Sequence, residues 1–133
     1  MGGERDCPFG WKAIQIPVSG KKYFIYIIQK FLQRVFEIMN KHLSDTNFGV
    51  EKLAENMAIS RSLLFKKVNA LIGESPNEFI KRTRLSKAAR LIEKNHGNIS
   101  EIALEVGFSN PSYFAECFKK QFGVAPSHYH IKS

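Results

Sequence analysis

The first sustained pattern of apolar and polar residues in the chain begins at about residue 25. Apolar residues then recur at steps of three and four positions, the spacing of one face of an amphipathic helix. They are Ile28, Leu32, Val35, Phe36, Met39 and Leu43. The turn-forming segment SDTNFG at 44–49 ends the pattern. The sequence therefore predicts a long first helix over about 25–43.

Capping signals place the helices that follow. Ser60 is an expected N-cap, and its helix should run to Ile72 and stop at Gly73. The tetrapeptide SPNE at 75–78 is typical of a capping box with proline at the first helical position, and it opens a helix expected over 75–95. NISE at 98–101 has the same cap-x-x-Glu pattern and predicts the start of the next helix. Because no strand-like alternation occurs after residue 40, the predicted fold is all-α.

The chain also contains an internal repeat, in which residues 53–79 match residues 102–129 when one extra residue is allowed near Pro111. Five residues are identical, and the apolar positions coincide as well. The apolar pairs include Leu53 with Ile102, Met57 with Val106, Ile59 with Phe108, Leu64 with Phe114, Val68 with Phe118 and Phe79 with Tyr129. Each copy reads as a short helix, a tight turn and a longer helix, which is the helix-turn-helix pattern. Gly107 is expected to supply the second turn, with Phe108 filling the angle between its helices.

The longer helix of each copy carries a second stripe opposite its apolar one. The stripe is Ser62, Phe65, Lys66 and Asn69 in the first copy and Ser112, Ala115, Glu116 and Lys119 in the second. Such spacing puts each set on a single outward face. In a DNA-binding helix-turn-helix this face enters the major groove. In the groove, Lys66 can donate to guanine O6 or N7 and Glu116 can accept from cytosine N4. Phe65 or Ala115 can contact a thymine methyl group.

An ordinary solvated face is the alternative interpretation of these stripes. Phe65 argues against it, since a large exposed aromatic side chain needs a reason.

The helix over 75–95 is predicted to serve two small cores. Phe79 and Ile80 point roughly opposite to the apolar residues of its second half, which are Leu85, Ala88, Ala89 and Ile92. About 20 residues at 1.5 Å each give roughly 30 Å. That length approaches the ~34 Å between successive major-groove faces on one side of B-DNA.

Charge favours a polyanionic partner such as nucleic acid or an anionic membrane. The chain has 20 Lys+Arg against 12 Asp+Glu, a net charge of +8 and a pI near 9.6. Residues 60–95 hold nine basic and three acidic residues, whereas residues 98–133 balance. We therefore expect the first copy and the joining helix to supply most of the attraction to phosphate, and the second copy to supply mainly selectivity.

The sequence gives little support for an enzyme, a metal-binding protein, a secreted protein or a membrane protein. Cys7 and Cys117 lie far apart, and neither they nor the four histidines have the spacing of a metal site or a catalytic triad. We expect no enzyme activity, no metal and no cofactor. The start of the chain lacks an apolar signal-peptide core, and the apolar run at 23–36 is interrupted and too short to span a bilayer. The expected location is the cytoplasm, without a membrane partner.

The stretch ISEIALEVGFSNPSYFAECFKKQFGVAPSHY at 99–129 resembles the second helix-turn-helix of AraC/XylS-type transcription regulators. SPNEFIKRTRLSKAARLIE at 75–93 is similar to that family's linker helix, particularly in output domains of response regulators and hybrid sensor kinases. The resemblance covers about residues 31–131. It implies seven helices, with helix-turn-helix subdomains at 25–74 and 96–133. It also implies a monomer that reads two adjacent major grooves of double-stranded DNA and activates promoters by contacting RNA polymerase.

The resemblance also implies which residues touch DNA. Base-reading positions fall on Arg61, Ser62, Phe65, Lys66, Asn110, Ser112, Ala115 and Glu116. We expect phosphate contacts from Ser60, Lys67, Lys81, Arg82, Arg84, Ser109, Lys119 and Lys120. A helical protein-interaction module that keeps the fold without specific DNA binding is the alternative, because the second copy is electrically neutral.

Residues 1–24 are expected to form an irregular leader, in which Trp11 and 14–16 are candidates for a short strand. This leader is too short to bury the core of a sensory domain. The sequence is therefore consistent with a minimal regulator, or with a fragment of a larger signalling protein.

Overall fold

The computed structural model describes residues 22–129, with side chains from Ile25 onwards, and this part of the chain folds into seven helices without a strand. The helices are α1 (Lys22–His42), α2 (Val50–Met57), α3 (Arg61–Ile72), α4 (Pro76–Glu93), α5 (Ile99–Glu105), α6 (Pro111–Phe122) and α7 (Pro126–Tyr129). The predicted all-α fold is confirmed. The candidate strand at 14–16 and the rest of the leader up to residue 21 lie outside the described residues.

The predicted ends of two helices differ from the structure. The first helix begins at Lys22, three residues before the apolar stripe suggested. The fourth ends at Glu93 rather than Asn95, because Asn95 adopts a left-handed backbone with φ +53°. Asparagine tolerates that conformation and often ends helices, so it belonged to the stop signal rather than to the helix.

Side-chain caps fix where the helices begin. The Ser60 hydroxyl accepts a hydrogen bond from the Leu63 N–H, and Asn98 with Glu101 forms a complete capping box on α5. At α4 the Ser75 hydroxyl accepts from the Glu78 N–H at 3.2 Å. The Glu78 carboxylate lies 3.5 Å from the Lys81 ammonium instead of bonding the Ser75 N–H. The serine bond of the predicted capping box is therefore present, and the glutamate bond is not.

The two copies of the repeat have the same backbone geometry at their turns. The Ile59 N–H donates to the Ala54 carbonyl at 3.1 Å, and the equivalent Phe108 N–H donates to the Ala103 carbonyl at 2.9 Å. The turn residue has a positive φ in both, +61° at Ala58 and +97° at Gly107. The residues that follow α3 and α6 are both left-handed glycines, as the repeat predicts.

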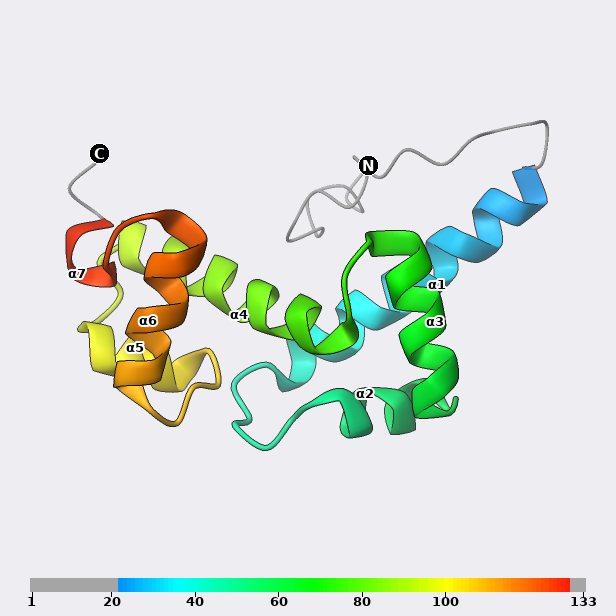
Figure 1. Cartoon of the computed structure of the whole chain (residues 1–133), viewed down its shortest axis with the longest axis horizontal. Helices are drawn as coiled ribbons and strands as arrows, with labels where there is room; N and C mark the ends of the chain where they lie inside the picture. Colours follow the sequence, from blue (N-terminus) through cyan, green and yellow to red (C-terminus); the bar gives the residue numbers. More distant parts are fainter. Residues whose placement is uncertain (1–21, 130–133) are drawn as a thin grey trace.

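Helix α4 joins two separate cores (Figure 1). The first core packs α1, α2 and α3 against Phe79 and Ile80. The second packs α5 and α6 against the apolar residues of the second half of α4 and is rich in aromatic rings. The prediction that one helix serves two cores is thus confirmed. We call the parts around these cores the first unit (α1–α3) and the second unit (α5–α7).

No helix among the described residues is both long enough and apolar enough to cross a membrane.

Candidate nucleic-acid interface

The second helix of each helix-turn-helix, α3 or α6, presents its predicted stripe to solvent. On α3 all four stripe residues are exposed, and Phe65 keeps 50% of its surface accessible. On α6 Ala115 is half-buried and the other three are exposed. In Figure 1 these two recognition helices lie at opposite ends of α4, and both begin at the lower edge of the view. Their N-terminal turns therefore face the same side of the molecule.

Three neighbouring hollows lie between the recognition helices. A hollow of about 510 Å³ lies beside α3, one of about 380 Å³ lies between the two units, and one of about 300 Å³ lies between α4 and α6. The first two share Asn77, and the last two share Glu78, Lys81 and Tyr113. We call the residues that line these three hollows, from α3 across the start of α4 to α6, the reading surface.

The residues at the starts of the recognition helices are held by capping and ion pairing. The Asn110 side-chain oxygen accepts from the N–H groups of Ser112 at 2.8 Å and Tyr113 at 3.1 Å. Asn110, predicted to read a base, thus serves as the N-cap of α6. Arg61 is exposed at the start of α3, with its guanidinium 3.7 Å from the Glu51 carboxylate. The caps Ser60 and Asn110 thus fix the first turns of α3 and α6.

Arg84, a predicted phosphate contact, is bound to protein groups. Its Nη2 donates to the backbone carbonyls of Asp45 and Phe48, both at 3.0 Å, so the guanidinium is committed to the loop between α1 and α2. Burial lowers the pKa of Arg84, and the nearby Asp45 charge partly opposes that shift. Arg84 also lines the hollow between the two units, and its contact with phosphate stays a prediction.

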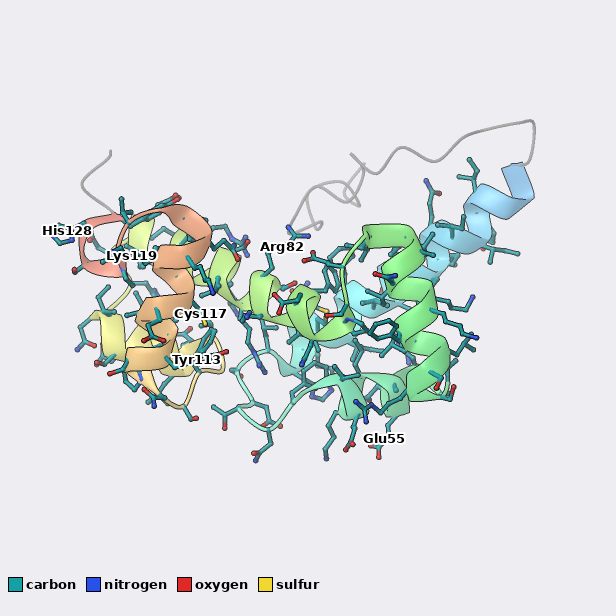
Figure 2. The ribbon with its side chains drawn as sticks, viewed as in Figure 1. Glu55, Arg82, Tyr113, Cys117, Lys119 and His128 are labelled. Atoms are coloured by element: carbon teal, nitrogen blue, oxygen red, sulfur yellow. The ribbon has the colours of Figure 1, made fainter. Side chains whose placement is uncertain are left out.

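Arg82 and Lys67, also expected to touch phosphate, contact protein groups too. Arg82 Nε donates to the Glu74 carboxylate at 2.7 Å, and Figure 2 shows the side chain projecting from α4 away from the edge where the recognition helices begin. The Lys67 ammonium lies 5.3 Å from the centre of the Phe31 ring of α1. At 100° per residue, Lys67 is about 150° around α3 from the centre of its outward stripe. Neither side chain belongs to the reading surface.

The remaining cations and hydroxyls predicted to touch phosphate stay at the surface. Lys81 is half-buried and lines the reading surface, and Lys120 lines the same surface from α6. Ser60, Ser109 and Lys119 are exposed.

The sequence interpretation missed two apolar side chains and an amide on or near this surface. Leu63 and Tyr113 occupy equivalent positions of the repeat and keep 41% and 49% of their surfaces exposed. Asn77 lies between the first two hollows. The repeat itself carried a signal, because a large apolar residue follows the stripe serine in both copies.

Tyr113 is also tied to the buried thiol one turn along α6 (Figure 2). The hydrogen bond between the Tyr113 hydroxyl and Cys117 raises the tyrosine pKa. Cys117 is a free cysteine; Cys7 lies outside the described residues. Among the described side chains, no group of three or more His, Cys, Asp or Glu residues is placed to hold a metal ion.

Comparison with known proteins gives consistent matches. A family model described as a helix-turn-helix domain matches residues 53–131. Histidine kinase P4 of Formosa agariphila is 40% identical over 103 residues, which are 77% of this chain and 8% of the kinase. The chain spans between 8% and 41% of the length of the first curated relatives it matches.

Two solved structures extend the comparison to the fold. The C-terminal domain of AraT, a response regulator from Geobacillus stearothermophilus, is 30% identical with a TM-score of 0.71, covering 77% of this chain and 85% of that one. The DNA-binding domain of AdpA, a global transcriptional factor solved with a target DNA, is 28% identical with a TM-score of 0.68, covering 74% of this chain and 87% of that one.

Proposed function

This chain belongs to the AraC-type family of helix-turn-helix transcription regulators, and we propose that it reads DNA by placing α3 and α6 in adjacent major grooves of one duplex. The reading surface carries this proposal. It joins the outward faces of both recognition helices, whose first turns face the same side of the molecule. The 18 residues of α4 span about 27 Å, which suits two readers near one helical turn apart.

The base contacts we propose come from the outward stripes. Lys66 donates to guanine, Glu116 accepts from cytosine, and Phe65 or Ala115 packs on a thymine methyl group. Arg61, Ser62 and Ser112 lie in or beside the same first turns, and Asn110 holds the start of α6 in place. The proposed phosphate contacts are Ser60, Ser109, Lys81, Lys119 and Lys120.

Selection of bound sequences from random DNA tests the two-groove proposal. We expect two blocks of preferred bases about one helical turn apart. Lys66→Ala should relax preference in one block and Glu116→Ala in the other, at about 1–3 kcal/mol per lost contact. A single block, or a loss spread evenly over both, would contradict the proposal.

Matched controls come from neighbouring charges outside the reading surface. Lys67→Ala removes the same charge from α3, one residue along, where the ammonium lies over Phe31. Glu105→Ala removes an exposed carboxylate at the end of α5. Both variants should keep the base preferences of the unchanged protein.

We further propose that the chain acts on transcription by contacting RNA polymerase at promoters. In this proposal it binds DNA as a monomer in the cytoplasm and has no enzymatic activity of its own. The part of Histidine kinase P4 that it matches is 8% of that protein. Transcription in vitro with purified polymerase tests activation: RNA from a promoter bearing the selected site should increase, and that from a promoter with a scrambled site should not.

A protein-interaction module without specific DNA binding is the second candidate, favoured by the neutral charge of residues 98–133. Such a module would yield no consensus in the selection.

A further inference from the structure

One arginine connects the two units beside the shared helix. Arg84 reaches from the middle of α4 to the loop between α1 and α2, where Nη2 donates to the carbonyls of Asp45 and Phe48 at 3.0 Å each. Both carbonyls belong to the first unit. One nitrogen, Nη2, donates to both acceptors, so the two bonds hold one end of the planar guanidinium against this loop.

Gly107, the turn residue of the second unit, lies directly against the same side chain. A Cβ at this position would lie 2.6 Å from Arg84 Nε, 2.9 Å from Arg84 Cζ and 2.4 Å from the Leu43 carbonyl oxygen. The backbone of the second turn therefore rests on the guanidinium and on the end of the first unit's long helix. Only a residue without a side chain allows this approach.

The buried Nε shows that this arrangement has a cost. Nε has no hydrogen-bond partner among the described residues, and burial disfavours the charged form of the side chain. A methionine would fill a similar volume without that cost. Methionine and lysine both lack the flat guanidinium, whose Nη2 bonds the first unit while Nε and Cζ pack close to Gly107 of the second.

Besides α4 itself, the approach of Gly107 to Arg84 and to the Leu43 carbonyl is the described contact between the units. The two buried cores share no residue, and apart from α4 the extensive helix–helix contacts stay within one unit. Since both units are packed on different halves of α4, small changes of tilt on that helix would alter the position of α6 relative to α3.

We propose that Arg84 is a positioning residue that fixes the angle between the two units, and thereby the spacing of the two DNA blocks that one chain reads. This inference rests on the proposed two-groove reading. Arg84 contacts no base in this proposal. It nevertheless determines one part of the DNA specificity, the number of base pairs between the two blocks.

Arg84→Met tests the proposal, with Arg90→Met as a matched control at an exposed position of the same helix. Binding is measured on duplexes that carry one block, two blocks at the selected spacing, and two blocks with one base pair inserted. The unchanged protein and Arg90→Met should lose about 10- to 100-fold affinity on insertion, because a rigid pair of readers loses the gain from tethering.

Arg84→Met should bind the selected spacing about 10-fold more weakly and should change by less than about threefold on insertion. Its affinity for one block should stay within about twofold of that of Arg90→Met, which loses the same charge. A spacing preference as sharp as that of Arg90→Met would overturn the proposal. Arg84→Lys, which keeps the charge but not the fork, serves if Arg84→Met does not fold, and it should show the same loosened preference.

Residual dipolar couplings of the free protein provide a readout independent of DNA. One alignment tensor should fit the amides of both units in the unchanged protein, whereas Arg84→Met should need a separate tensor for each unit. A single shared tensor in that variant would also overturn the proposal. If the unchanged protein shows no two-block preference, the two-groove function fails, and the tensors still decide whether Arg84 fixes the angle.

Discussion

At the scale of the residue, the environment of each cation decides what it does. Lys66, Lys67, Arg82 and Arg84 all belong to the basic stretch at 60–95. Only Lys66 among these four points from the outward stripe of a recognition helix, while the others contact Phe31, Glu74 and backbone carbonyls. Counting charges along the stretch therefore overstates the positive charge that faces DNA.

Gly107 gives a test of close backbone approach. Its φ is +97° and a Cβ there would clash with the Leu43 carbonyl, whereas Gly73, with φ +89°, has open space around it. Gly73→Ala should lower the free energy of unfolding by about 1–2 kcal/mol through the left-handed backbone alone. Gly107→Ala should cost about 1–3 kcal/mol more, because the neighbouring backbone must move.

Urea denaturation of the two glycine variants measures both costs. Gly123→Ala is a second control, since it combines φ +84° with open space and should match Gly73→Ala. Equal losses at Gly73 and Gly107 would show that the contact between the units is looser than described.

At the scale of the element, the shortest helix is held by its tertiary contacts rather than by its own length. Helix α7 has four residues, too few for a stable helix in isolation. The Tyr129 ring packs edge-on against Phe118 with 5.3 Å between ring centres, and its hydroxyl donates to the Glu93 carboxylate at 2.9 Å. This contact fastens the end of the second unit to the end of α4.

Tyr129→Phe tests the hydrogen bond to Glu93 through the pH dependence of stability. Burial and the hydrogen bond to Glu93 raise the pKa of Tyr129 above its usual value of 10. The variant should be less stable by about 0.5–1 kcal/mol at neutral pH, where the hydroxyl is protonated in both states. Above about pH 10 the unfolded chain ionises first. The stability of the unchanged protein then falls, and the difference between the two proteins should shrink.

Denaturation curves of both proteins between pH 7 and about pH 11 provide the measurement. Tyr26→Phe is a control, since Tyr26 is exposed on α1, outside both cores. A difference for Tyr129→Phe that grows above pH 10 would contradict the assigned hydrogen bond.

At the scale of the whole molecule, the two-unit arrangement creates a surface that neither unit has alone. The reading surface combines cations from α3, α4 and α6 with two acidic residues, Glu78 and Glu116. Its positive charge suits the phosphate backbone, and the acidic residues suit selective contacts with base donors.

The dependence of DNA affinity on salt tests this surface as a whole. With phosphate contacts from three lysines, Lys81, Lys119 and Lys120, affinity should fall about 40-fold between 50 and 200 mM salt. Lys119→Gln should reduce the slope of log affinity against log salt by about 0.9, the value for one lost phosphate contact. Lys67→Gln removes the same charge but lies over Phe31, so its slope should stay unchanged.

The two lysine variants separate local contact from general charge. Equal slopes for both would mean that net charge alone drives binding. A flat salt response of the unchanged protein would favour the protein-interaction module.

The sequence by itself determined the local structure of this protein. Spacing of apolar residues, caps such as Ser60 and Asn98, and the repeat of 53–79 in 102–129 predicted the helices, the two turns and the outward stripes. These signals act over a few residues, because helical periodicity and capping depend on neighbours along the chain. They failed only at helix ends, as at Asn95, where one residue type permits two conformations.

Only the tertiary structure decided which side chains are available to a partner and how the units are oriented. The contacts of Arg84, Gly107 and Lys67 join residues that are 23 to 64 positions apart, and no local pattern encodes such pairings. The reading surface likewise arises because α3 and α6 pack on one shared helix, α4. Its shape depends on the angle at which the two cores meet α4. We attribute that angle to the side-chain volumes in both cores and to the half-buried guanidinium of Arg84.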